Sequence, residues 1–238
     1  MAKPTPGAAL DDDFRLADFK LLLPLGEDVR ALVIETAERA FAQHLDADVA
    51  QLDQPQATAS PPRDDYDLVF TEHLGAARYL RPGGWLCLLL ASSSAQSVDA
   101  AQEVAGLQPI GRWRAYPEWP AFRGLIPETP GGWRAASRAL RLFPWRSPLG
   151  IGARLWPELA AHWLPTNGIA LYQRPGPHVP TLLSRILDAL SEQGAGMLRT
   201  TPLERWLLVS GRLGPGNPIL AFALDAQGEP RHLIKVAR

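Results

Sequence analysis

The sequence lacks several features that would assign a protein class at once. Its single cysteine, Cys87, excludes a disulfide within the chain and lies in an apolar run, as a small core residue would. No apolar run approaches the ~20 residues of a membrane-spanning helix. The N-terminus lacks the apolar segment of a secretory signal and soon reaches three aspartates at 11–13, so we expect a cytoplasmic protein.

Net charge is also nearly absent. The formal charge of −1 provides no overall attraction to nucleic acid, so no nucleic-acid partner is expected. Charged residues make up 21% of the chain and apolar residues 46%, which is typical of a soluble globular protein. The 238 residues suffice for one large domain or two small ones.

Proline, in contrast, is abundant. Many of the 23 prolines fall in linkers and between residues 117 and 180. Proline interrupts helices and sheets because it lacks an amide donor and fixes its backbone angle. This middle region is therefore predicted to hold short helices and turns.

The stretch from Tyr66 to Ser92 has the clearest pattern. Two uninterrupted apolar runs, Leu68–Phe70 and Leu86–Leu90, are typical of parallel strands that are covered on both faces. Residues 75–80 between them can form a short helix, which Pro82, Gly83 and Gly84 would end. The stretch therefore predicts a strand, helix and parallel strand of a doubly wound sheet.

Other segments continue the same alternation. The predicted strands cover residues 29–34, 49–52, 109–116 and 168–174, and the predicted helices cover 37–45 and 98–107. Strands alternating with helices indicate an α/β fold.

The sequence Tyr-Asp-Leu-Val-Phe, followed by Tyr-Leu-Arg-Pro-Gly-Gly-Trp-Leu-Cys-Leu-Leu-Leu, resembles the fourth and fifth strands of class I S-adenosylmethionine-dependent methyltransferases. The resemblance implies an α/β domain over 14–175 with a reduced doubly wound, mostly parallel sheet, after a disordered lead at 1–13. It also implies S-adenosylmethionine as the cofactor and a small or lipid-linked metabolite as the methyl acceptor.

Candidate cofactor-binding residues follow the first two strands. The turn Glu35-Thr36-Ala37 lacks the glycines that this family uses to admit the cofactor, and only 12 residues separate Asp53 from Tyr66, too few for another helix and strand. Both observations predict a reduced sheet and a compromised pocket. Asp53 stands where the family has an acid for the ribose hydroxyls, but the missing glycines favour a loop carboxylate that caps and solvates a strand end.

Glu72 and His73 follow the strand at 66–71, at the edge where such sheets bind ligands. They could contact the substrate, or they could be a solvated pair on a surface turn. The sequence leaves both interpretations open.

The segment 117–166 and the strand before it are rich in tryptophan and arginine. The tryptophans are Trp113, Trp119, Trp133, Trp145, Trp156 and Trp163, and the arginines are Arg112, Arg114, Arg123, Arg134, Arg138, Arg141, Arg146 and Arg154. Three interpretations fit: a lid that packs on the sheet, peripheral contact with an anionic membrane, or stacking on nucleic-acid bases. The lid is favoured, and nucleic acid is the weakest of the three.

The C-terminal part, 176–238, is predicted to form a small α+β antiparallel piece. A helix at 181–192 precedes strands at 206–210, 219–224 and 232–237. A glycine-rich turn with Gly211, Gly214 and Gly216, followed by Lys235 in the third strand, resembles the start of the aminoglycoside phosphotransferase and choline kinase fold. The resemblance implies that these residues contact nucleotide phosphates. A plain three-stranded meander is the alternative.

Two functions follow from these observations. The first is an S-adenosylmethionine-dependent methyltransferase-like protein with reduced or lost activity. The second is a non-catalytic binding or scaffold module that works with a small-molecule kinase. Because the chain ends at Arg238, before the catalytic parts of a kinase, ATP is expected only if a separate kinase-domain protein completes the lobe.

Overall fold

The computed structural model describes residues 19–34, 45, 49–55, 61–90, 106–116, 124–139, 168–177, 179–192, 201–210 and 218–237. It is an α/β protein with a ten-stranded mixed sheet and few helices. The chain forms two compact units. We call them the parallel unit, Lys20–Gly111 with Ile169–Gly194, and the antiparallel unit, Met1–Phe19 with Arg112–Gly168 and Ala195–Arg238.

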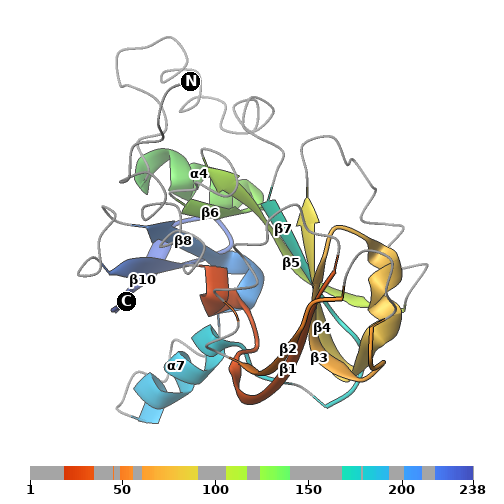
Figure 1. The fold of residues 1–238 in the computed structure, drawn as a ribbon. Coiled ribbons are helices and arrows are strands. Elements are labelled where there is room, and N and C mark those ends of the chain that lie inside the picture. The colour runs from red at the N-terminus through yellow and green to blue at the C-terminus, as the bar shows by residue number, and fades with distance from the viewer. Residues whose placement is uncertain are drawn as a thin grey trace, which may run out of the picture. The chain divides into compact units, whose positions relative to one another are not determined.

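The parallel unit is built around strands in the order β7-β4-β3-β1-β2 (Figure 1). These are β1 (Gly26–Ile34), β2 (Val49–Asp53), β3 (Tyr66–Thr71), β4 (Leu80–Leu90) and β7 (Gly168–Gln173). β1 pairs in parallel with β2 and β3, and β3 pairs in parallel with β4. Every residue of β3 is buried, as expected for a strand covered on both faces. The parallel pairing predicted for the two apolar runs is confirmed.

The sheet is reduced at its β2 end, as the short spacing before Tyr66 predicts. Among the described strands, β2 pairs with β1 alone. Residues 61–65, the described part of the connection to β3, hold neither helix nor strand.

The Leu-Arg-Pro-Gly-Gly segment differs from its prediction. The helix before it, η2 (Leu74–Tyr79), is a 3-10 helix, and β4 already begins at Leu80. Tyr66 pairs with Leu80 and Leu68 pairs with Trp85, so β3 advances by two residues where β4 advances by five. The segment therefore forms an irregularity within strand β4. Gly83 donates its amide to Arg174 O at 3.0 Å, and Gly84 O accepts from Arg174 N at 2.8 Å. The glycines therefore permit a close approach of two backbones instead of ending a helix.

Helix α7 (Leu182–Glu192) confirms the amphipathic helix predicted at 181–192. Thr181 caps it, because its Oγ1 accepts the amide of Ser184 at 3.1 Å. Its first residue, Leu182, donates to Leu23 O at 2.8 Å, and Arg185 donates to Leu25 O at 2.6 Å. These bonds attach α7 to the segment after the short helix η1 (Phe19–Leu22).

The antiparallel unit has strands in the order β10-β9-β8-β6-β5. These are β5 (Gln108–Tyr116), β6 (Gly124–Pro127), β8 (Trp206–Ser210), β9 (Ile219–Leu224) and β10 (Pro230–Val236), and the short helix η4 (Leu203–Arg205) leads into β8. Helix α4 (Pro130–Ala139) packs beside β6 (Figure 1), where its Trp133 joins a buried cluster with Ile126, Leu207 and Leu224.

The C-terminal strands correct the resemblance to a kinase lobe. β8 pairs with β6 through Leu125 and Leu208, so β8, β9 and β10 continue a unit that already holds β5, β6 and α4. The kinase interpretation is therefore wrong. β8–β9 and β9–β10 are antiparallel, as predicted for the C-terminal piece. The sheet as a whole is mixed and not mostly parallel, because β5–β6 and β6–β8 are antiparallel as well.

Strand β6 and helix α4 lie in the region predicted only as short helices and turns. Trp113 is fully buried and donates its indole N–H to Trp206 O at 2.9 Å. Trp133 is 7% exposed. Both side chains are buried, Trp113 in strand β5 itself and Trp133 on helix α4. Trp119, Trp145, Trp156 and Trp163 lie outside the described residues.

The lead at 1–13 and most of the helices predicted at 37–45 and 98–107 also lie outside the described residues.

Glycine substitutions test the close approach at Gly83. Its φ is +80°, and an added Cβ would lie 1.9 Å from Pro177 O. Gly106 has φ +61° with nothing within 4 Å of an added Cβ, and Gly75 is open as well. We expect Gly75→Ala to be near neutral, Gly106→Ala to cost about 1 kcal/mol of unfolding free energy, and Gly83→Ala to cost clearly more. Urea unfolding measures all three, and equal effects of the Gly83 and Gly106 variants would contradict the close approach.

Candidate functional site

The parallel unit contains a topological switch point. β2 lies on one side of β1 and β3 lies on the other. The connection from β1 to β2 therefore runs in one direction across the sheet, and the connection from β2 to β3 runs in the opposite direction. In open sheets of this kind, ligands bind outside the carboxyl ends of the strands at that point. Ile34 and Thr71 are paired at the ends of β1 and β3 and mark the place.

Two of the candidate residues follow β3 at this edge. Glu72 is partly buried and His73 is exposed, and the backbone amide of His73 donates to Thr71 Oγ1 at 3.0 Å. This bond turns the chain from the strand into η2. Glu35 and Thr36, which follow β1, lie outside the described residues.

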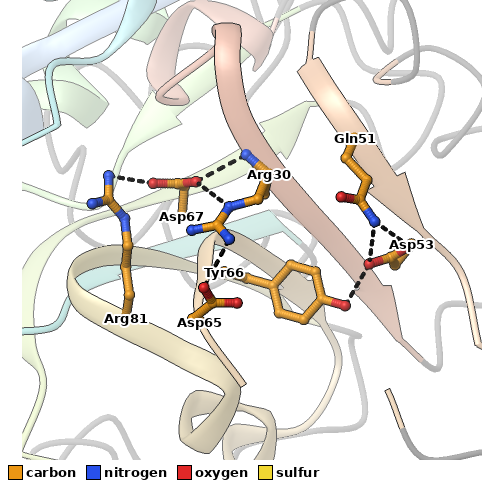
Figure 2. Close-up of polar contacts among 7 residues, drawn as sticks. All are labelled: Arg30, Gln51, Asp53, Asp65, Tyr66, Asp67 and Arg81. Atoms are coloured by element: carbon orange, nitrogen blue, oxygen red, sulfur yellow. Dashed lines mark hydrogen bonds and ion pairs between the residues drawn. The ribbon is translucent and has the colours of Figure 1, made fainter. Parts of the chain in front are cut away.

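Asp53, the last residue of β2, is partly buried and already has partners (Figure 2). Gln51 Nε2 donates to both of its carboxylate oxygens, at 3.1 and 3.2 Å. The hydroxyl of Tyr66 donates to Asp53 Oδ2 at 2.5 Å. Asp53 is therefore held in place from β2 and β3 together.

Tyr66 is fully buried in an apolar cluster with Leu32, Val69 and Leu80. Burial, the hydrogen bond to Asp53 and the charge of that carboxylate raise the pKa of Tyr66 well above its usual value. The phenol therefore stays neutral and acts as a donor to Asp53.

A second polar group lies near the start of β3 and β4 and at the middle of β1 (Figure 2). Asp67 is 2% exposed; its Oδ2 accepts the amide of Arg30 at 2.9 Å, and its Oδ1 pairs with Arg81. Arg30 also donates to Asp65 at 2.7 Å, and this bond contributes most to raising the pKa of Arg30. The group joins β1, β3 and β4 and is structural.

The antiparallel unit has an arginine cluster of its own. Glu128 lies 3.2 Å from Arg112 Nε and 2.7 Å from Arg114 Nη2, and Arg114 lies over the ring of Trp133 at 5.2 Å. Two of the arginines of the tryptophan-rich region thus border the cluster under α4.

Lys235 is exposed on β10, opposite Leu220 of β9, and Gly211, Gly214 and Gly216 lie outside the described residues. In the described part of the chain, no three metal-binding side chains gather at one place. None of the helices described is long and apolar enough to cross a membrane.

No family model matches the chain. A search of curated proteins also finds no match. Among solved structures, the chain is similar to the one titled "Crystal Structure of the [4+2]-Cyclase SpnF", with a TM-score of 0.34 and 15% identity over 68% of this chain and 82% of that chain. This distant likeness supports no inference about ligand or reaction. The prediction of a methyltransferase-family domain followed by a kinase lobe is therefore wrong: the comparisons give only this distant likeness, and the last three strands pair with β6 instead of starting a kinase lobe.

Sequence reasoning missed Arg30, Gln51, Tyr66, Asp67 and Arg81. The signal for the polar group around Asp67 was present, since Asp67 is a charged residue within an otherwise apolar strand and must be paired when buried. No sequence signal gives its partners, which are 37 and 14 residues away.

Substitution of Asp67 tests its structural role. We expect Asp67→Asn to lower the unfolding free energy by about 2–3 kcal/mol, because Arg30 and Arg81 lose a buried charged partner while staying partly hydrated themselves. The matched change Asp64→Asn, at an exposed loop position, should be near neutral. Chemical denaturation measures both, and a neutral Asp67→Asn would contradict the role.

The raised pKa of Tyr66 predicts a pH dependence. The folded state favours the neutral phenol, so the stabilisation from Tyr66 is complete below pH 10, the usual pKa of tyrosine, and is lost as the pH rises above it. The stability difference between the native chain and Tyr66→Phe should therefore shrink between pH 9 and pH 11. Thermal unfolding across this range measures it, and a constant difference would count against the prediction.

Proposed function

We propose that the parallel unit binds S-adenosylmethionine at the carboxyl ends of β1, β2 and β3, and uses it to methylate a small or lipid-linked metabolite. The observation that carries the proposal is the switch point between β1 and β3, with Asp53 at the end of the neighbouring strand. This argument rests on strand order and not on the likeness to any solved structure.

The charges at this edge favour one class of ligand. Asp53, the last residue of β2, and Glu72, the residue after β3, both carry carboxylates. Carboxylates accept hydrogen bonds from hydroxyl groups and attract a cation, but they repel phosphates. A cofactor with ribose hydroxyls and a positive sulfonium fits these residues better than a phosphate-bearing nucleotide.

In this proposal each residue has a defined task. S-adenosylmethionine supplies a methyl group activated by its sulfonium. Asp53 accepts a ribose hydroxyl and thereby fixes the adenosine end. Glu72 and His73 lie at the end of β3, where their proton-accepting groups can receive the proton that the acceptor releases.

A second function is favoured by the bonds already made to Asp53. Tyr66 and Gln51 already donate to this carboxylate, so Asp53 has hydrogen-bond partners without a ligand. The turn at 35–37 also lacks glycine. A non-catalytic binding or scaffold module fits both observations. Cooperation with a separate small-molecule kinase and contact of the region 117–166 with an anionic membrane belong to this second proposal.

Ligand-dependent thermal unfolding distinguishes the two functions. Ligand at 100 times its Kd should stabilise the native chain by about 2.7 kcal/mol, so S-adenosylmethionine and S-adenosylhomocysteine should both raise the Tm. Asp53→Ala should abolish this rise, and Asp64→Ala, at an exposed loop position, should keep it.

An unchanged Tm at millimolar ligand would exclude the first function and leave the scaffold module. A rise that survives in Asp53→Ala would exclude Asp53 as the ribose ligand.

A further inference from the structure

The partners of Asp53 leave its two carboxylate oxygens unequal. Among the described residues, Oδ2 accepts from the Tyr66 hydroxyl at 2.5 Å and from Gln51 at 3.2 Å, whereas Oδ1 accepts only from Gln51, at 3.1 Å. A carboxylate oxygen has about two accepting positions. Oδ2 is therefore filled by the protein's own donors, and of the two positions on Oδ1 the described part of the chain occupies one.

Both donors are held by the fold. Tyr66 is fully buried, with its ring packed in the cluster of Leu32, Val69 and Leu80. Gln51 lies two residues from Asp53 on β2, so the two side chains are on the same face of the strand. Figure 2 shows Tyr66 and Gln51 approaching the carboxylate from different strands.

We infer that Tyr66 and Gln51 are positioning residues, which hold the Asp53 carboxylate in one orientation and direct its Oδ1 toward a single hydroxyl of the ligand. The inference rests on the proposed binding of S-adenosylmethionine. It adds a specificity: the unit distinguishes ligands by their ribose hydroxyls, and this discrimination depends on a tyrosine that does not itself contact the ligand.

The alternative role for the Tyr66–Asp53 bond is a structural tie between β2 and β3. The two roles differ in a measurable way. If the bond is a structural tie, its loss either weakens the binding of every ligand by a similar factor or leaves all affinities unchanged. Loss of a positioning contact weakens only ligands that have the hydroxyls.

Calorimetric titration of the full chain tests the inference. The probes are S-adenosylhomocysteine and its analogue without the 2′ and 3′ hydroxyls. We expect the native chain to prefer the first by about tenfold or more, as for a hydrogen bond to a charged group. Tyr66→Phe should weaken the affinity for S-adenosylhomocysteine by about tenfold and leave the affinity for the analogue unchanged.

Tyr79→Phe is the matched control. Tyr79 is also packed against the cluster around Tyr66, but its hydroxyl accepts from Arg78 at 2.6 Å and is not bonded to Asp53. Its removal should leave both affinities unchanged. Gln51→Ala, a change at a partly exposed position on the edge strand, should reduce the preference as well and gives the same test if Tyr66→Phe does not fold.

The outcomes separate the inference from the proposed function. No binding of S-adenosylhomocysteine to the native chain would overturn both. Binding without preference for the hydroxyls would overturn the inference and leave cofactor binding intact. Binding with a preference that Tyr66→Phe and Gln51→Ala retain would also overturn the inference alone.

Discussion

The pairing of the buried Asp67 carboxylate with two arginines is the constraint on which the parallel unit depends. A carboxylate that is 2% exposed must be paired and hydrogen-bonded, because its desolvation is otherwise too costly. Its partners, Arg30 and Arg81, come from the neighbouring strands β1 and β4, on either side of β3. One buried charge thus links β3 to the middle of β1 and to the start of β4. The same register places Ile34 beside Thr71 at the carboxyl ends of β1 and β3.

The two ends of these strands have different tasks. Near the start of β3, charges of both signs satisfy one another, Asp65 and Asp67 against Arg30 and Arg81. The carboxyl ends hold Asp53 and the Glu72–His73 pair. Tyr66 connects the two ends, because its backbone lies at the start of β3 while its hydroxyl reaches the last residue of β2. The packing of the sheet and the orientation of Asp53 are therefore coupled through a single buried side chain.

In the antiparallel unit, local sequence patterns predicted where the C-terminal strands lie but not which strands they pair with. Residues 206–210 and 219–224 were predicted as strands and are strands, since alternation and turn residues are local signals. Their assignment to a kinase lobe failed because pairing partners are not local. β8 pairs with β6, whose residue Leu125 lies opposite Leu208, and the indole of Trp113 bonds to Trp206, 93 residues later. Gly131 and Gly228 likewise meet with their backbones in direct contact, so each position excludes a Cβ.

The sequence alone determined the strands other than β6, that Leu68–Phe70 and Leu86–Leu90 lie in buried parallel strands, that the sheet is reduced before Tyr66, and that α7 is amphipathic. These properties depend on spacing and polarity within a few residues. Only the tertiary structure decided that the Leu-Arg-Pro-Gly-Gly segment bulges within β4, that the last three strands join β6, and that Tyr66 and Gln51 hold Asp53. Those features are contacts between residues distant in the chain, and the geometry of the folded backbone alone brings them together.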